Sequence, residues 1–237
     1  MSFPVTLSDL QAYISNLIND PTNTRYSLTL INNQLDIAQD RWNLEAQICR
    51  TSQTLTVVAN QASYGLTTLT GTFLKMLRVA HKGIQLTKRS KMTLDMYSAI
   101  DWTTTLATPT SYLLDMTVNP PVIFLYPQPQ ANDAGAFLLV EYLVRHTSMV
   151  NPGDTLFMIG GTTNTLIAPY SFGIGLDVAA SLLEPDPTPE TVAKAKLFRS
   201  QANSVLSIVT QIYADFDLDE PYRMTGGRVW FPGRTVF

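Results

Sequence analysis

Apolar residues recur at intervals of three and four in three segments of the chain, and this spacing predicts amphipathic helices. Two segments lie near the beginning, at residues 7–17 and about 26–49, and one lies near the end, at residues 188–212. Pro169 suits the first turn of a further helix that runs to about residue 183, so four helices are expected. The last segment has the most regular stripe, which consists of Val192, Ala195, Phe198, Ala202, Val205, Val209 and Ile212. An apolar stripe of this length requires other helices to cover it.

Capping residues support the helix boundaries. Thr6 and Asp9 form a variant of the capping box before the first apolar stripe. Thr188 precedes Pro189 at the start of the last stripe, where a cap followed by proline is typical of a helix N-terminus. The break at residues 184–187 is short, so the third and fourth helices are expected to be antiparallel neighbours.

The third predicted helix contains the sequence Gly173-Ile174-Gly175. A dinucleotide-binding fingerprint requires a third glycine and a preceding strand, and this segment has neither. We therefore interpret the two glycines as positions where another helix packs closely against this one.

The middle of the chain is rich in short β-prone segments separated by turn residues. These segments are residues 51–58, 64–66, 73–79, 84–87 and 111–116. Residues 120–129 and 136–144 are joined by a polar loop that ends in Gly135, a pattern that predicts a central β-hairpin. The apolar run 122–126 is fenced by prolines, which predicts a strand buried on both faces. Strands at this density favour an antiparallel sandwich or a small barrel.

Together these patterns predict an α+β fold. Its body is an antiparallel helical bundle of about four helices, with an inserted antiparallel β domain that resembles a sandwich or barrel, and an extended C-terminal arm. The N-terminal helices occupy residues 1–50, the β-rich insertion 51–150, the C-terminal helices 151–216 and the arm 217–237.

The last residues of the chain lack a helical period but are rich in aromatic and basic side chains. Disordered segments are poor in aromatic residues, so we interpret this stretch as an arm that docks in a groove of a partner. The aromatic side chains would anchor the arm, and its arginines would pair with carboxylates, for example those of residues 215–220 in a neighbouring copy. The candidate interface residues are Tyr222, Arg223, Arg228, Trp230 and Phe231.

Composition favours self-assembly and excludes several classes of function. Charged residues make up 15% of the 237 residues, against roughly 25% in typical soluble domains, so copies of the same chain are expected to cover much of the surface. A monomer with a surface rich in serine, threonine, asparagine and glutamine is the alternative. A net charge of -3 provides no basic footprint for gripping nucleic acid. Without a signal peptide or a membrane-spanning apolar run, the protein is expected to be made in a cytoplasm.

Residues for catalysis or metal binding are scarce. His81 and His146 are the two histidines, and neither belongs to a zinc-binding motif. Cys49 is the single cysteine and is expected to be a packed thiol. The alternating carboxylates of residues 215–219 lack the glycine and glutamate that a calcium loop requires further along. No catalytic, metal or cofactor residues are therefore predicted.

Four local patterns follow one another along residues 26–215. They are Ile31-Asn32-Asn33 with Ala38 and Trp42 in the second helix, Leu94-Asp95 followed by residues 109–112, residues 124–129 followed by 139–142, and Pro169-Tyr170 opening a helix that contains Ala179-Ala180 and ends in Leu182-Leu183. In this order they resemble the head-to-tail adaptor (connector) proteins of short-tailed bacteriophages, the tail tubular protein A-like family. The arm has no counterpart in this resemblance.

The resemblance implies a structural virion protein of the neck or tail, assembled in the host cytoplasm. It implies a ring of about twelve copies beneath the portal protein, in contact with tail nozzle or tail fibre proteins. Double-stranded DNA would pass through the channel without sequence-specific binding, and no membrane and no cofactor would be involved.

Three other functions are compatible with parts of the sequence. One is another ring component of the phage tail or neck. A second is a β-rich module that binds carbohydrate or a receptor, motivated by the β-rich centre and Trp102. A third is a hydrolase that uses His81 and His146.

Overall fold

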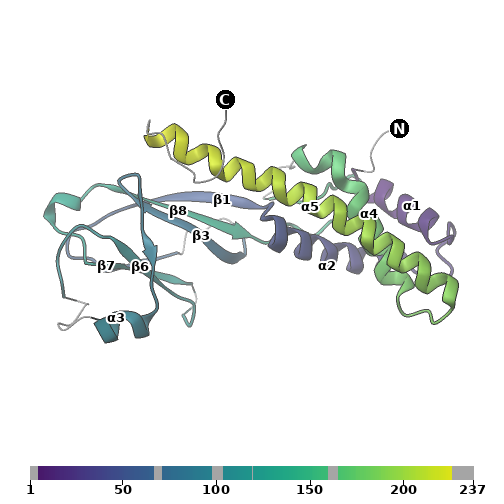
Figure 1. The fold of residues 1–237 in the computed structure, drawn as a ribbon, viewed down its shortest axis with the longest axis horizontal. Coiled ribbons are helices and arrows are strands. Elements are labelled where there is room, and N and C mark those ends of the chain that lie inside the picture. Colours follow the sequence, from purple (N-terminus) through teal and green to yellow (C-terminus); the bar gives the residue numbers. More distant parts are fainter. Residues whose placement is uncertain (1–4, 67–70, 98–103, 119, 160–164, 226–237) are drawn as a thin grey trace, which may run out of the picture. The chain divides into compact units, whose positions relative to one another are not determined.

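The computed structural model describes residues 5–66, 71–97, 104–118, 120–159 and 165–225 (Figure 1). The chain divides into two compact units, which are treated separately below. We call residues 1–49 together with 145–237 the helical unit, and residues 50–144 the β unit.

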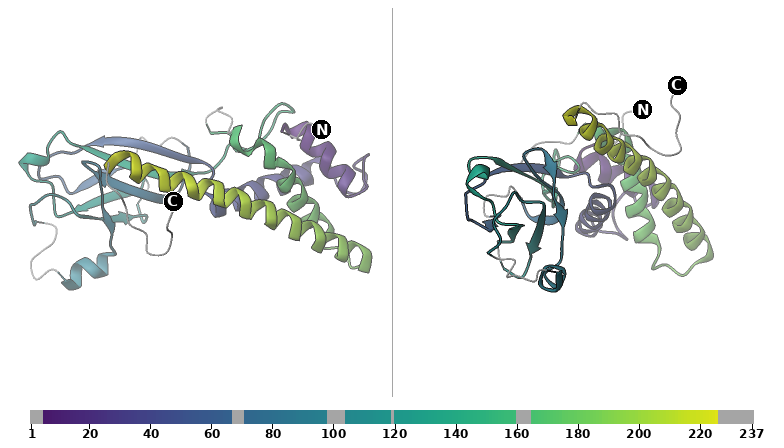
Figure 2. Two further views of the ribbon diagram at one scale, coloured as in Figure 1. Left: turned by 45° about the horizontal axis from the view of Figure 1, so that its top comes forward. Right: turned by 60° about the vertical axis from the view of Figure 1, so that its left-hand side comes forward.

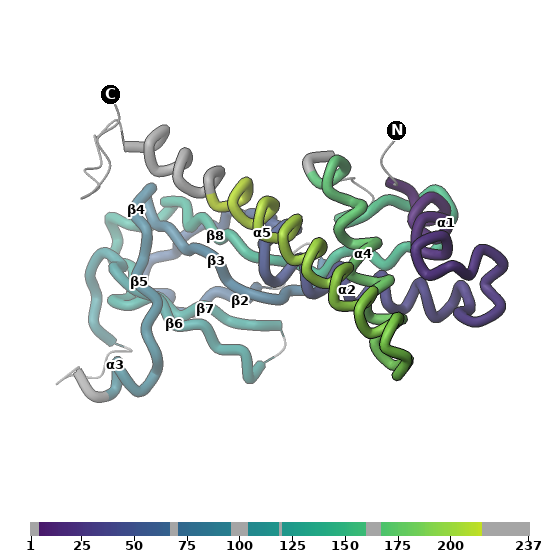
Figure 3. Tube along the Cα trace, turned by 45° about the vertical axis from the view of Figure 1, so that its right-hand side comes forward, coloured from purple at the N-terminus to yellow at the C-terminus, as the bar shows by residue number. Residues whose placement is uncertain are grey.

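All four predicted helices are present in the helical unit. They are α1 (Leu7–Leu17), α2 (Leu28–Ala46), α4 (Ser171–Leu183), which follows the 3-10 helix Thr165–Tyr170, and α5 (Pro189–Thr225) (Figure 1). Helix α4 packs against α1, α2 and α5, and α5 runs alongside it (Figure 3). Nearly every residue of α4 is buried, so this helix forms the centre of the unit.

The predicted helix caps are confirmed. The hydroxyl of Thr6 accepts a hydrogen bond from the backbone N–H of Asp9, and the Asp9 carboxylate accepts one from the backbone N–H of Thr6. The hydroxyl of Thr188 accepts a hydrogen bond from the backbone N–H of Thr191, in the first turn of α5, which begins at Pro189. These bonds satisfy amide groups that the first turn of a helix leaves without partners.

Close packing at the α4 glycines is also confirmed. A Cβ atom on Gly173 would lie 2.6 Å from Cη2 of Trp42 and 2.7 Å from Cγ1 of Val205. A Cβ atom on Gly175 would lie 2.6 Å from Cδ1 of Tyr13. Since real Cβ atoms do not approach other atoms this closely, glycine is what allows α1, α2 and α5 to reach α4.

Helix α5 is longer than the sequence pattern predicted. The apolar stripe ends at Ile212, but helical backbone continues to Thr225, so the expectation of an extended segment is wrong for residues 217–225. Loss of an apolar period does not by itself end a helix, because the hydrogen bonds that define the helix join backbone groups, and here the helix continues even through Pro221. A glycine pair, Gly226-Gly227, comes directly after its last residue.

The described residues of the β unit form two sheets of four strands each (Figure 2). In order across the first sheet, the strands are β1 (Arg50–Thr56), β8 (Phe137–Val144), β3 (Phe73–His81) and β4 (Ile84–Gln85). Across the second they are β2 (Ser63–Gly65), β7 (Val122–Tyr126), β6 (Ser111–Asp115) and β5 (Thr87–Lys88). The pairs are antiparallel except for β5 with β6. The unit also holds α3 (Lys91–Tyr97) and a 3-10 turn at Ala131–Asp133.

The predicted central hairpin is wrong, because β7 and β8 belong to different sheets. Strand β7 forms its hairpin with the preceding strand β6, and β8 is paired with β1 and β3. Pro127 and Pro129 follow β7 and have no N–H to continue a ladder, so the chain leaves one sheet before it enters the other. Strand β7 is also less enclosed than expected, since Ile123 and Leu125 are fully buried but the residues between and beside them are half-buried.

The α+β class is confirmed, with five α-helices and two mostly antiparallel sheets in the part of the chain that the structure describes. In the β unit the fully buried side chains come from both sheets, with Leu138 and Val140 on β8 and Ile123 and Leu125 on β7. Within the same described residues, none of the helices combines the length and apolar character needed to cross a membrane.

Replacement of Gly173 by alanine tests the close helix contact. Trp42 is fully buried and cannot move aside easily, so we expect Gly173→Ala to lower the free energy of unfolding by about 1–3 kcal/mol, as overpacking does. Gly153→Ala is the matched control, because a Cβ atom there would meet nothing within 4 Å. Urea unfolding of both variants measures the difference, and equal stability would contradict the packing argument.

Candidate functional site

Only two of the five predicted interface residues lie within the described part of the chain. Tyr222 and Arg223 lie in the last turns of α5. Arg228, Trp230 and Phe231 lie outside the described residues, as does Trp102, which motivated the carbohydrate-binding alternative. The candidate site must therefore be built from other residues of the helical unit.

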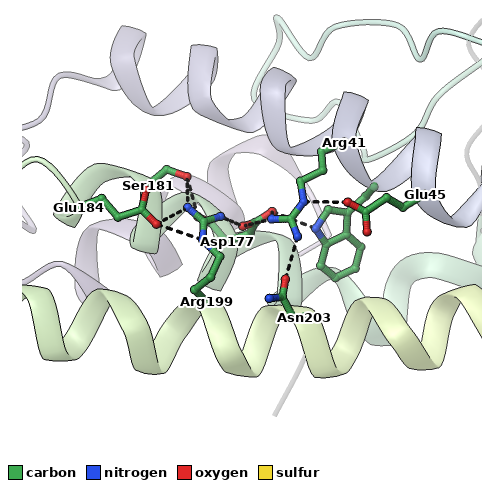
Figure 4. Close-up of polar contacts among 8 residues, drawn as sticks. Arg41, Glu45, Asp177, Ser181, Glu184, Arg199 and Asn203 are labelled. Atoms are coloured by element: carbon green, nitrogen blue, oxygen red, sulfur yellow. Dashed lines mark hydrogen bonds and ion pairs between the residues drawn. The ribbon is translucent and has the colours of Figure 1, made fainter.

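A buried carboxylate on α4 forms the centre of a polar network between three helices (Figure 4). Asp177 has only 2% of its side chain exposed. It accepts a hydrogen bond from Nε1 of Trp42 at 3.1 Å and from Nη1 of Arg41 at 3.0 Å, both on α2. It also pairs with the guanidinium of Arg199 on α5. Two cations thus compensate for the cost of burying this charge.

Each arginine extends the network to the surface (Figure 4). Arg41 donates to Glu45 at 3.0 Å and to Asn203 at 2.7 Å, so it links α2 with α5 directly. Arg199 donates to Glu184 at 2.7 Å. Burial alone would lower the pKa of the Arg199 guanidinium, but the nearby carboxylates of Glu184 and Asp177 have the larger effect, so this pKa is raised above its usual value.

A groove of about 1000 Å³ lies beside this network along α5. Its lining combines apolar and small polar side chains with charged ones and consists of Glu184, Val192, Ala195, Lys196, Arg199, Ser200, Asn203, Ser204, Ser207 and Ile208. We call this feature the α5 groove. Its volume is at the upper end of the range of about 300–1,000 Å³ that is typical of ligand pockets.

Helix α2 carries an exposed apolar ridge next to the network. Leu30, Ile37 and Leu44 are 39%, 59% and 50% exposed, and their spacing of seven residues places them nearly in line along the helix. Arg41 lies four residues after Ile37 and three before Leu44, so the ridge borders the side of α2 that faces Asn203. A row of exposed large apolar side chains on a helix is typical of a protein–protein interface.

The two histidines are poor candidates for catalysis. His146 is 4% exposed, and its ring nitrogens lie 3.5 Å from Asp36 and 3.3 Å from Asp40. Burial lowers the pKa of His146, although both carboxylates oppose the shift. His81 is 2% exposed, and burial lowers its pKa as well. Neither imidazole is accessible to a substrate, which removes the support for a hydrolase.

Cys49 is a packed thiol, as expected. It is fully buried, and burial raises its pKa to about 12, so it is protonated and unreactive at neutral pH. Among the described side chains, no group of three His, Cys, Asp or Glu residues is placed to hold a metal ion.

Sequence reasoning missed the Asp177 network, although a signal was present. Asp177 is the only charged residue between Ser171 and Leu183, in a segment apolar enough to be buried on all sides. A charge in such a helix requires a buried partner. The partners could not be identified from sequence, because Arg41 and Arg199 are 136 and 22 residues away along the chain.

The network makes a prediction about stability. Asp177→Asn keeps the shape of the side chain but leaves two arginines without a buried counter-charge, so we expect a loss of about 3–5 kcal/mol in the free energy of unfolding. Glu45→Gln removes an exposed partner of the same Arg41 and should cost less than about 1 kcal/mol. Chemical denaturation compares the two variants, and similar losses would show that Asp177 is not central.

His146 makes a prediction about pH. Its pKa is lower in the folded protein than the value of about 6.5 in an unfolded chain, so its contribution to stability is complete above that pH and is lost as the pH falls toward the folded pKa. We expect the loss of unfolding free energy between about pH 7.5 and pH 5 to be smaller in His146→Gln than in the natural protein. Asp20 and Asp154 have lowered pKa values and stay ionised in this range. The same pH dependence in both proteins would refute the assignment.

Comparison with known proteins identifies the family. Residues 5–218 match the family model described as SU10 adaptor protein. A search of curated proteins found no significant match. The matched residues include the strands, α1 to α4 and most of α5, while the five predicted interface residues all lie beyond them. The chain therefore belongs to the SU10 adaptor protein family, a family of phage head-to-tail adaptors, and the family assignment made from the sequence is confirmed.

Proposed function

We propose that this protein forms a ring of about twelve copies between the portal and the tail of a short-tailed bacteriophage. The family match over residues 5–218 is the observation that carries the proposal. In this role the protein is a structural component of the virion neck, assembled in the host cytoplasm, and it performs no catalysis.

The surface of the helical unit supports assembly with identical neighbours. The α2 ridge exposes Leu30, Ile37 and Leu44, and the α5 groove is a concave surface on another helix of the same unit. When two different surfaces of one chain meet between copies, the contact repeats from copy to copy and can close into a ring. The low fraction of charged residues fits a chain whose surface is largely covered by its neighbours.

The charge of the chain supports a channel through which DNA slides. Proteins hold DNA mainly through lysine and arginine contacts to phosphates, and these contacts set the affinity. With a net charge of -3, the chain is suited to let double-stranded DNA pass without sequence-specific binding. The proposed protein partners are the portal on one side of the ring and tail nozzle or tail fibre proteins on the other.

The C-terminal end supplies the proposed anchor between subunits. Tyr222 and Arg223 would contribute from the end of α5, and Arg228, Trp230 and Phe231 from the residues that follow it. Aromatic and arginine side chains are the residue types that contribute most to binding energy at interfaces.

Electron microscopy of the purified protein mixed with the portal of the same phage tests the proposed function. We expect closed rings stacked on the portal along a common axis. A protein that remains monomeric and does not bind the portal would refute the proposal.

Truncation after Thr225 tests the anchor and leaves every described helix intact. We expect the truncated chain to fold with unchanged thermal stability but to lose ring formation, measured by light scattering and electron microscopy. The full-length variant with Trp230→Ala and Phe231→Ala should show the same loss, because the aromatic side chains provide most of the binding energy. Normal rings from either protein would contradict the anchor.

A further inference from the structure

The α5 groove has the size and lining of a receptor for aromatic side chains such as those at the C-terminal end of the chain. Residues 226–237 contain Trp230, Phe231 and Phe237 together with Arg228 and Arg234. We propose that the α5 groove receives Trp230 and Phe231 from a second copy of the chain. This inference rests on the proposed function, since it requires neighbouring copies.

The lining of the groove matches the chemistry of this segment. Val192, Ala195 and Ile208 provide apolar contact for aromatic rings, while Ser200 and Ser204 are small enough to let a chain approach α5. An aromatic ring in the groove would contact both apolar side chains and small polar side chains. Pockets that bury the anchor residues of interfaces have this mixed lining.

Of the charged groups of the groove, Arg199 and Glu184 suit the same occupant, whereas Lys196 has the same sign of charge as the arginines of that segment. Lys196 is exposed in the groove, and the guanidinium of Arg199 is held in place by Glu184 and Ser181 with 26% of its side chain exposed. A fixed guanidinium stacks favourably on an aromatic face. Glu184 is 52% exposed and can accept a further hydrogen bond from an arginine such as Arg228.

The length of the chain prevents Trp230 from reaching the middle of the groove in its own chain. Ser200, in the middle of the groove, precedes Thr225 by 25 residues of helix, which is about 38 Å at 1.5 Å per residue. Trp230 follows Thr225 by five residues and can lie at most about 18 Å beyond it when fully extended. The remaining gap of about 20 Å is too long for an indole side chain to span. Trp230 therefore cannot reach Ser200, in the middle of the groove, in its own chain.

A disulfide trap tests the contact in the full-length protein. One chain carries Ser200→Cys and the other, with a tag that changes its mass, carries Val229→Cys. After mixing, assembly and mild oxidation, we expect a cross-linked pair of the two chains on a non-reducing gel, because a disulfide requires Cα atoms within about 7 Å. The buried Cys49 stays unreactive in this experiment.

Gln201→Cys is the matched control for the groove position. It is the next residue of α5, is also exposed, and points about 100° away around the helix, outside the groove lining. Cross-linking of Gln201→Cys with Val229→Cys as efficient as that of Ser200→Cys would overturn the proposal. A chain that carries both Ser200→Cys and Val229→Cys should form a ladder of covalent multimers, and an intramolecular disulfide would also overturn it.

The outcomes separate this inference from the proposed function. Rings that bind the portal but give no cross-link at Ser200 would refute the groove as the receptor and leave the adaptor function standing. A chain that stays monomeric in the presence of portal would refute both. Cross-linking of Val229→Cys to the portal in place of a second copy would show that the C-terminal segment docks on the portal, and would refute the α5 groove as its receptor.

Discussion

The helical unit depends on the neutralisation of one buried carboxylate. Asp177 lies on α4, which is otherwise apolar and almost completely buried. Its two counter-ions come from different helices, Arg41 from α2 and Arg199 from α5. Because an unpaired buried charge is far more costly than a paired one, the positions of these two helices on α4 are set together.

Packing and charge act on the same helix contact. Gly173 lies one turn before Asp177, and the missing side chain makes room for Trp42. The indole of Trp42 then donates its N–H to Asp177, so it fills the space over the glycine and satisfies the carboxylate at once. Because both packing and hydrogen bonding fix this contact, α2 and α5 have little freedom to move on α4. A binding surface that is already rigid before assembly loses less conformational entropy when it binds.

The proposed assembly surface lies on the outside of this arrangement. Arg41 and Arg199 extend from the buried carboxylate to the surface, where they lie beside the α2 ridge and in the lining of the α5 groove. The family match ends at residue 218, so it includes the helices that carry this surface. The aromatic residues at the end of the chain lie beyond the match. Helix α5 combines both roles, because it lines the groove and leads into that end.

The sequence by itself determined the features that depend on neighbouring residues. The four helices of the helical unit, the Thr6 cap and the close contact at Gly173 follow from periodicity, capping chemistry and side-chain size within short segments. Asp177 could have been singled out in the same way, as a lone charge in an apolar helix. Only the tertiary structure decided that β7 pairs with β6 and that Arg41 and Arg199 meet at one carboxylate. These choices are made between segments far apart in the chain, where several partners satisfy the same local pattern and only packing in three dimensions selects one.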